Sequence, residues 1–554
     1  MNLGKVLNSN MSLTHTGEFQ CSTIHQIEGY TNKYSHSIVS DSRSLDATAH
    51  VLSHRNLCRQ GGFVQTTSPK RVLLVQSYLG RKGVSDQLVY PIGLSCIATA
   101  LDAAGHIPWI VDLNVGGEPY ERLEREIQRF KPDVIGVSQR NIDSTTRKAP
   151  FVYHTQLRPT LRTIRQHAPH AVTVIGGPGF TQSSDAFFER YDFDFGVKSE
   201  GEETIVSLLE NLSTPHKVRG VYYRGEGGRP VFTGDASMPT FETLPYPKRH
   251  FIDWELYRQE ERARHLFLDI GIESTRGCPR KCAYCNYPML NGVKLRRKPP
   301  AVVVDEIEYL QRTFNIPQFT FTDSRFNENS RHARAVCEEI IRRGVKIRWV
   351  AWLGFRRISS EFLSLMRDAG CYRVAFSPDG LLQPSLNRMR KELRTQEIFD
   401  SIKAVQKVPG LKSSWSFFAT PPSTSNREQL AMLGMYAYIH GSMPGRGRMM
   451  LNWCRVEEHT HFEKIAREDG VLPAGIDLLP EDPVALDATF YEPPGFQRWS
   501  RFWNRFLDAE LAARFAAGRI AAPLRRSGLK VRDITPDHMK GMANEHKGLA
   551  DAVR

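Results

Sequence analysis

Ser274-Thr-Arg-Gly-Cys278-Pro-Arg-Lys-Cys282-Ala-Tyr-Cys285-Asn-Tyr-Pro288 is the stretch of this chain that restricts its fold and chemistry most. Its three cysteines follow the spacing C-x3-C-x2-C, directly after an apolar segment, residues 266–272, that reads as a strand. Thiolates this close on one loop can ligate three corners of an iron–sulfur cube, because iron favours soft sulfur ligands. No fourth cysteine has a matching spacing, so one iron would stay open for a ligand that is not protein.

A zinc loop is the alternative for the same cysteines. Zinc sites of this kind usually take a fourth ligand from a Cys or His that has its own pair spacing. His250 and His265 lie upstream of the loop, but neither belongs to such a pair. The spacing therefore favours the cluster over zinc.

Composition places the chain among soluble globular proteins. Its 554 residues are too many for one core and predict three to four domains. No apolar run reaches about 18 residues, and no basic segment followed by an apolar one begins the chain, so we expect neither a membrane span nor export. Nine cysteines, an odd number, do not resemble a disulfide framework and favour the cytoplasm.

The net charge of +14 raises the question of an anionic partner. The basic residues are spread thinly, as in Arg342-Arg343 and Arg356-Arg357, and no basic run is interleaved with aromatics. The pattern predicts ordinary surface charge rather than a nucleic-acid groove. A basic pocket for an acidic small molecule stays open.

Short β-branched segments alternate with helical ones from residue 70 to residue 215. Expected strands lie at residues 71–75, 109–112, 133–138 and 171–176 and near residue 193. This alternation predicts an α/β domain with a doubly wound, Rossmann-like parallel sheet. In such a sheet ligands lie beyond the carboxyl ends of the strands, and the residues there that we expect to contact a cofactor are Ser77, Ser138, Gly176, Gly177 and Gly201. Glycines at this edge suit a nucleotide or a flavin equally well, and each is also compatible with a purely structural turn.

A second strand–helix alternation begins at the cysteine loop, in residues 266–455. Its six expected strands predict a partial (β/α)6 TIM-like barrel, with chemistry at the carboxyl ends of the strands, and they lie at residues 266–272, 319–322, 347–352, 373–376, 413–418 and 448–453. Residues 216–265, rich in Arg, Gly and Pro, are expected to be a linker, and residues 1–69 a poorly ordered leader.

Residues 456–554 are expected to form a mainly helical extension. Trp499, Trp503 and Phe506 recur at spacings of three and four, which places them on one helix face. Packing of this face against the barrel is one interpretation, and a lid over a substrate is the other.

The cysteine spacing, with the aromatic Tyr284 between the last two cysteines, resembles the radical S-adenosylmethionine (SAM) superfamily. Residues 70–215 ahead of it look like the cobalamin-binding domain of cobalamin-dependent (class B) radical SAM methyltransferases. The resemblance implies three cofactors: a 4Fe–4S cluster held by Cys278, Cys282 and Cys285, SAM on the open iron, and cobalamin as methyl carrier (methylcobalamin). It also implies an external electron donor such as flavodoxin or ferredoxin. Residues that act directly in catalysis are not assigned by it.

The resemblance extends to the rim of the barrel. It implies that Asp323 reaches the SAM amino group, and that Ser377 and Asp379 contact the ribose or carboxylate of SAM. A simple Pro-Asp-Gly turn is the alternative for Asp379. Two family motifs are missing, the Gly-Gly-Glu motif of SAM binding and the Asp-x-His-x-x-Gly motif whose His ligates cobalt. The lower face of cobalt would therefore be empty, water-filled or met by another side chain, for which Gln139 and Arg140 are candidates.

Among these methyltransferases the chain most resembles those of natural-product pathways, above all the P-methyltransferases of phosphinothricin-type antibiotic biosynthesis. Their reaction, methylation of the H-phosphinate of N-acetyldemethylphosphinothricin, is compatible with a surplus of arginine, because guanidinium pairs bidentately with oxyanions. Methylation of carbon in a tryptophan or polyketide-like intermediate is one alternative. A cyclisation or rearrangement without methyl transfer is another.

Overall fold

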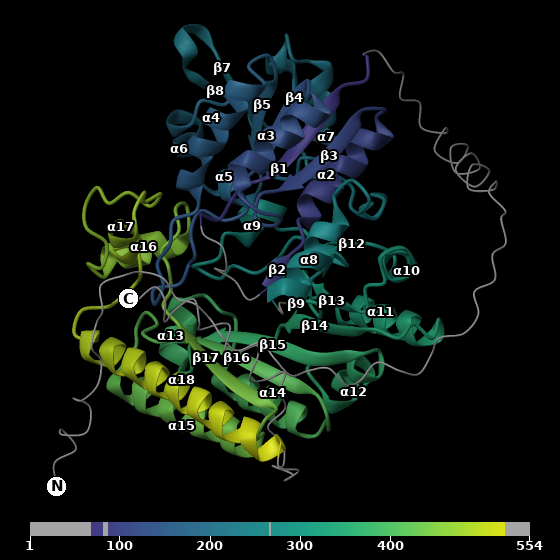
Figure 1. The fold of residues 1–554 in the computed structure, drawn as a ribbon. Coiled ribbons are helices and arrows are strands. Elements are labelled where there is room, and N and C mark those ends of the chain that lie inside the picture. The colour runs from purple at the N-terminus through teal and green to yellow at the C-terminus, as the bar shows by residue number, and fades with distance from the viewer. Residues whose placement is uncertain (1–67, 81–86, 265–266, 527–554) are drawn as a thin grey trace, which may run out of the picture. The chain divides into compact units, whose positions relative to one another are not determined.

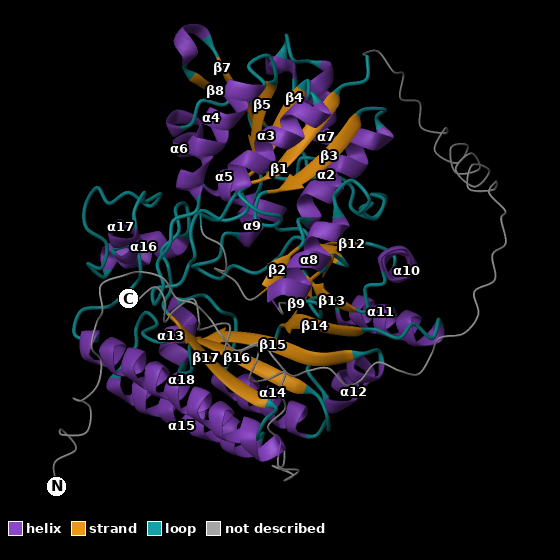
Figure 2. Ribbon diagram, in the orientation of Figure 1, coloured by secondary structure: helices purple, strands orange, loops and turns teal. Residues whose placement is uncertain are grey.

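The computed structural model describes residues 68–80, 87–264 and 267–526, all within one compact unit that begins at Gln65. The expected leader, apart from its last two residues, and residues 527–554 of the expected extension lie outside these ranges. Within them, no helix is both long enough and apolar enough to cross a membrane. Figure 1 shows the path of the chain, and Figure 2 shows two separate groups of strands with helices around them.

The first group is a seven-stranded sheet in the order β3-β1-β4-β5-β6-β7-β8. Its strands are β1 (Arg71–Gln76), β3 (Ile107–Asp112), β4 (Val134–Ser138), β5 (Val172–Gly176), β6 (Phe195–Val197), β7 (Val221–Arg224) and β8 (Pro230–Phe232). The strands from β3 to β6 pair in parallel, which confirms the predicted doubly wound sheet. The strand order reverses at β1, and the crevice beside such a reversal is where these sheets bind ligands.

Both faces of this sheet are buried, as its continuous apolar strands require. In β1, Val72 and Leu74 pack into one core cluster and Leu73 and Val75 into another, because successive side chains point to opposite faces. The covering helices are α2 (Ile92–Ala103), α3 (Pro119–Phe130), α4 (Leu157–His167), α5 (Pro178–Gln182), α6 (Ser184–Arg190) and α7 (Glu202–Glu210).

The second group is a six-stranded sheet in the order β10-β13-β14-β15-β16-β17, with every neighbouring pair parallel. Its strands are β10 (Gly271–Ile272), β13 (Gln318–Phe321), β14 (Arg348–Leu353), β15 (Cys371–Asp379), β16 (Lys412–Phe418) and β17 (Gly447–Asn452). Strands that follow chain order and alternate with helices confirm the predicted partial barrel. The helices are α10 (Pro300–Phe314), α11 (Ser330–Arg342), α12 (Ser360–Asp368), α13 (Gln383–Arg388), α14 (Thr395–Gln406) and α15 (Asn426–Ser442).

Residues 216–265 differ from the expected linker. Strands β7 and β8 add an antiparallel edge to the first sheet, and α8 (Trp254–Arg264) follows them. Three of the segment's glycines, Gly225, Gly227 and Gly228, form the tight turn between β7 and β8. These glycines therefore indicate a hairpin turn within the segment, not a linker between domains.

The expected first barrel strand is divided in two. Its first part, β9 (Phe267–Asp269), pairs with β2 (Gln87–Val89) of the preceding domain. Only the second part, β10, joins the barrel sheet. The chain thus links the two domains by a parallel strand pair just before the cysteine loop. Short elements beside the loop are β11 (Thr275–Arg276), β12 (Arg296–Arg297) and α9 (Tyr287–Asn291).

Helices α16 (His461–Glu468), α17 (Pro483–Asp487) and α18 (Gln497–Arg526) follow the barrel. Trp503 is fully buried, and its indole donates to Gln429 Oε1 of α15 at 2.6 Å. The indole of Trp499 donates to Asn426 Oδ1 at 2.8 Å. This part of the aromatic face packs against the barrel, as the first of the two interpretations predicts.

Candidate active site

The cysteine loop is fixed by backbone contacts on both sides. Gly277, with φ of 87°, makes the entry turn, and a Cβ there would lie 2.2 Å from Lys294 O. Cys278 N donates to Gly292 O at 3.0 Å, and Ala283 N donates to Met389 O at 2.8 Å. Only glycine satisfies this turn, since it combines a left-handed backbone with a close approach.

Cys278 is buried, whereas Cys282 and Cys285 are partly exposed. Burial raises the pKa of the Cys285 thiol to about 11. Among the described residues no group of three or more His, Cys, Asp or Glu side chains could hold a metal ion. Three thiols on one short loop are nevertheless the donor set that suits an iron–sulfur cluster.

Asp323 holds the strand that enters the loop. Its carboxylate accepts hydrogen bonds from Ser274 N at 2.8 Å, Thr275 N at 3.0 Å and the Ser274 hydroxyl at 2.5 Å. Burial raises the pKa of this carboxyl to about 6, although these hydrogen bonds oppose the shift. These contacts position the backbone ahead of the cysteines, and the contact of Asp323 with the SAM amino group stays a prediction.

Tyr284 and Asp379, both predicted cofactor residues, meet directly. The Tyr284 hydroxyl donates to Asp379 Oδ2, and Lys391 forms a buried ion pair with the same oxygen. Lys391 Nζ also lies 2.6 Å from the Tyr284 hydroxyl. Asp379 has a left-handed backbone, with φ of 65°, a conformation that costs a non-glycine residue about 1–3 kcal/mol and clusters at functional sites. The third predicted rim residue, Ser377, lies on the same strand, β15.

A buried charge network joins the cysteine loop to the preceding domain. Arg276, two residues before Cys278, binds Glu202 at 2.6 Å, Glu273 at 2.8 Å and Glu200 at 3.1 Å. Arg296 binds Glu200 as well. Glu200 and Glu202 flank Gly201 at the carboxyl edge of the first sheet, so this edge and the cysteine loop lie side by side.

The carboxyl edge of the first sheet presents buried polar atoms without protein partners. In the described part of the chain, Ser77 Oγ after β1 and Gln139 Oε1 after β4 are buried and make no hydrogen bond. These two strands flank the point where the sheet order reverses. The corrin ring of cobalamin is rimmed by primary amides, whose N–H groups are donors for such oxygens. The edge therefore fits cobalamin by its hydrogen-bonding chemistry.

The predicted glycines at this edge differ in their surroundings. Gly177 has φ of 93°, and a Cβ there would lie 2.8 Å from both Gln139 O and Ser138 Oγ. A Cβ at Gly176 would meet only Val197 O, at 3.5 Å. Gly201 is buried against Ile97 and Val197, where a Cβ would lie 3.2 Å from each side chain. Close packing thus explains Gly201, and a strained turn explains Gly177.

Sequence reasoning missed Lys391, Glu457 and the Arg276 network. Glu457 follows β17; its Oε2 atom is buried without a partner among the described residues, and burial raises the pKa of the carboxyl to about 7. Neither Lys391 nor Glu457 belongs to a motif, so no local signal marks them. The position of Arg276 beside Cys278 was the one available hint.

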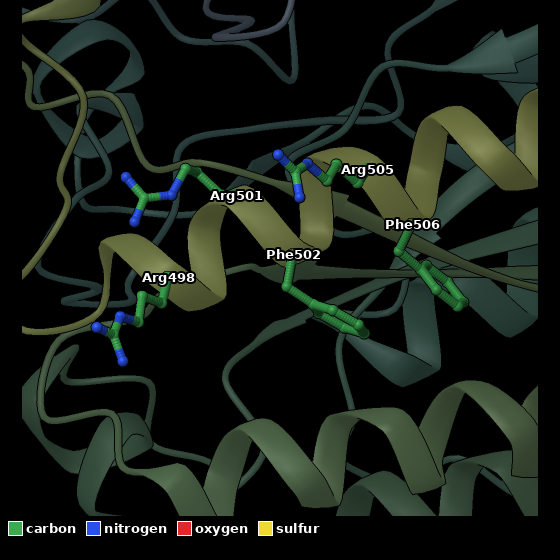
Figure 3. A pocket seen from close by; sticks show the side chains of 5 residues that line it. All are labelled: Arg498, Arg501, Phe502, Arg505 and Phe506. Atoms are coloured by element: carbon green, nitrogen blue, oxygen red, sulfur yellow. The ribbon is translucent and has the colours of Figure 1, made fainter. Parts of the chain in front are cut away.

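A hollow of about 430 Å³ lies on helix α18. Its lining residues all belong to this helix, and in Figure 3 Arg501 and Arg505 project from the opposite side of the helix to Phe502, Phe506 and Arg498. None of the predicted cofactor residues lines it, so it is not part of the candidate active site.

Comparisons with known proteins agree with this geometry. Residues 80–209 match the B12 binding domain, and residues 272–426 match the radical SAM superfamily. A cytidylyl-2-hydroxyethylphosphonate methyltransferase of Streptomyces wedmorensis is 25% identical over 440 residues, which cover 69% of this chain and 80% of that protein. A tryptophan 2-C-methyltransferase of Streptomyces laurentii is 24% identical over 350 residues, covering 52% of this chain and 57% of that protein.

A solved structure shares the fold. The radical SAM methyltransferase TsrM from Kitasatospora setae, with cobalamin and a 4Fe–4S cluster bound, is 21% identical, with a TM-score of 0.60 over 74% of this chain and 77% of that one. The chain therefore belongs to the radical SAM superfamily, as a member with a B12 binding domain ahead of its radical SAM domain. It is an enzyme of the methyltransferase type in that superfamily, and its cofactors are cobalamin, an iron–sulfur cluster and SAM.

Proposed function

We propose that this enzyme methylates the phosphorus of an H-phosphinate, of the N-acetyldemethylphosphinothricin type, in phosphinothricin-type antibiotic biosynthesis. The observation that supports it most is the Arg276 network, because this network places the carboxyl edge of the B12 binding domain against the cysteine loop. Methyl transfer to an unactivated centre requires these two cofactor sites to face one substrate. The phosphonate substrate named for the Streptomyces wedmorensis relative supports a phosphorus-containing acceptor.

The chain's own residues take three tasks in this proposal. Cys278, Cys282 and Cys285 hold the cluster, while Asp323 and Gly277 fix the shape of their loop. Tyr284, Lys391 and Asp379 form the polar wall beside it, where the ribose or carboxylate of SAM would bind. When bound, the cluster supplies the electron that cleaves SAM, and cobalamin carries the methyl group.

The first sheet takes the remaining task. Ser77, Ser138 and the turn at Gly176 and Gly177 offer hydrogen-bonding groups and close backbone approach to cobalamin, with Gly201 packing beneath them. Exclusion of water from the space between the domains keeps radicals from side reactions. An outside reductant such as flavodoxin or ferredoxin would supply the electrons, and the protein acts in the cytoplasm.

Incubation of the reconstituted enzyme with methyl-labelled SAM tests the proposal. With N-acetyldemethylphosphinothricin we expect one labelled methyl group on phosphorus, with 5′-deoxyadenosine and S-adenosylhomocysteine as coproducts. Label in tryptophan instead would favour carbon methylation, for which the Streptomyces laurentii relative is the precedent. Turnover without S-adenosylhomocysteine would indicate a cyclisation or rearrangement and refute methyl transfer.

The Cys282→Ala variant tests the cluster assignment separately. We expect it to lose 5′-deoxyadenosine formation and part of its iron, because a cluster edge would lose its thiolate. Cobalamin binding should persist, since the first sheet is untouched. Cys337→Ala, which alters a buried thiol on α11, is the matched control and should keep SAM cleavage.

A further inference from the structure

Strand β15 presents polar and small side chains to the inner face of the barrel. In β15, Val374 and Phe376 pack with the helices in the core, so Arg373, Ala375 and Ser377 between them point to the opposite, inner face. The same alternation holds in β14, where Trp349, Ala351 and Leu353 belong to the core. Trp352 therefore faces inward, and it is 46% exposed.

Strand register arranges these inner residues in rows. Trp352, Ala375, Ser414 and Arg448 are successive partners across β14, β15, β16 and β17. Two small residues thus lie at the middle of this row, between a tryptophan and an arginine. The middle of this row therefore carries the smallest side chains, and its charged side chain lies at the β17 end.

Arg373 lies one row nearer the start of the strands, level with Val350 and Lys412. It is exposed, and in the described ranges its guanidinium makes no hydrogen bond or ion pair; its one ring contact is with Tyr372, 5.9 Å from the ring centroid. Arg348, also on the inner face, lies 4.5 Å from the centroid of the same ring. By contrast, Arg343 on the helical surface binds three carboxylates.

One half-buried carboxylate, that of Asp269, interacts electrostatically with arginines of both domains. Burial raises the pKa of Asp269, at the end of β9, and the positive charges of Arg140 and Arg373 oppose this shift. Arg140 follows Gln139 at the carboxyl edge where cobalamin is proposed to bind. Asp269 Oδ1 is buried without a partner among the described residues.

We infer that Arg373 is the anchor for an oxyanion of the substrate, with Arg348 beside Tyr372 adding positive charge below it. The inference rests on the proposed function, because it assigns the phosphinate or carboxylate of that substrate to this position. The Arg373 guanidinium, which has no hydrogen-bond partner among the described residues, can pair with two oxygens of such an anion. Asp269 Oδ1 offers an acceptor for an N–H donor of the same molecule, such as its acetamido group.

Calorimetric titration of the cluster- and cobalamin-loaded enzyme with N-acetyldemethylphosphinothricin tests the inference. We expect Arg373→Gln to weaken binding about 10- to 100-fold, since hydrogen bonds to charged groups contribute about 1.5–3 kcal/mol. Arg373→Lys keeps the charge but loses the fork, and an intermediate loss is expected. Arg312→Gln, on the exposed face of α10, is the matched control and should bind as the wild type does.

Steady-state kinetics separates anchoring from a general structural effect. Arg373→Gln should raise KM for the phosphinate while 5′-deoxyadenosine formation at saturating substrate, and cobalamin content, stay near wild type. Unchanged affinity in Arg373→Gln, or an equal loss in Arg312→Gln, would overturn the inference. If Arg373→Gln does not fold, Arg373→Lys decides, because wild-type affinity there would exclude a bidentate anchor.

The binding experiment also distinguishes this inference from the proposed reaction. Binding that depends on Arg373, without label on phosphorus, would refute P-methylation and retain the anion anchor. Label on phosphorus, together with a wild-type KM in Arg373→Gln, would support P-methylation and refute the anion anchor. Inorganic hypophosphite, the smallest H-phosphinate, serves as a second probe that lacks the carboxylate.

Discussion

Replacement of Arg276 by methionine should destabilise the enzyme more than any surface substitution. The Arg276 side chain is 7% exposed and lies within hydrogen-bonding distance of Glu200, Glu202 and Glu273, the first two of them equally buried. Removing one partner of a buried ion pair costs about 3–5 kcal/mol, because the remaining charge stays out of water. A typical free energy of unfolding is about 5–15 kcal/mol, so the loss is a large part of it.

The pH dependence of this loss has a definite sign. Burial alone would raise the pKa of Glu273, but Arg276 overcomes it and the pKa is lowered in the folded enzyme. In the wild type this carboxylate therefore stabilises the fold above its unfolded pKa, and that contribution disappears as the pH falls through the lower folded pKa. Without Arg276, burial dominates and raises the folded pKa. Protonation of Glu273 then removes the unpaired buried charge of the variant as the pH falls. The difference in free energy of unfolding between wild type and variant should therefore shrink from pH 8 to pH 5.5.

Guanidinium denaturation followed by tryptophan fluorescence measures both quantities. Arg276→Lys, which keeps a charge, should lose less than the methionine variant. Arg342→Met removes an exposed pair with Glu339 and should change the free energy by less than about 1 kcal/mol. A loss below 1 kcal/mol in Arg276→Met, or a deficit that grows as the pH is lowered, would refute the reasoning.

Three further predictions concern single positions. Gly177→Ala should lower cobalamin affinity and the free energy of unfolding, the latter by about 1–3 kcal/mol, because the Gly177 backbone is left-handed and an added Cβ would meet Gln139 O. Equilibrium dialysis and denaturation measure the two effects. Gly93→Ala in α2 is the control, since an added Cβ there meets nothing within 4 Å and should leave stability unchanged or raise it. Glu457 has a folded pKa raised to about 7, so it makes wild-type stability fall between about pH 4.5 and 7; Glu457→Gln should flatten that part of the stability profile and be more stable at pH 8. Lys391→Met leaves Asp379 buried with only the Tyr284 hydroxyl, and should weaken SAM binding, measured by calorimetry, while cobalamin content is kept.

Local patterns sufficed for the architecture of this enzyme. Apolar β-branched segments and the helices between them predicted both sheets, because strand and helix periodicities are local properties of the chain. They did not reveal that β7 and β8 extend the first sheet, since Gly225, Gly227 and Gly228 look the same in a hairpin turn as in a linker.

The candidate site divides in the same way. The three cysteines Cys278, Cys282 and Cys285 lie within one short stretch of sequence, so their spacing alone predicts a three-thiol ligand set. Lys391 meets Tyr284 across 107 positions of sequence, and Arg276 meets Glu202 across 74. No motif encodes such pairs, because each forms only when the fold brings distant segments of the chain together.

The sequence by itself thus determined the cofactor chemistry and the order of the two domains, both of which are written in short-range spacing and periodicity. Only the tertiary structure decided which charges surround the cysteine loop, which polar atoms at the sheet edge lack partners, and which arginine faces the inside of the barrel. The physical reason is that burial and pairing belong to the packed chain. The sequence does not distinguish Arg373 from the other arginines, because only the fold determines which groups surround its guanidinium.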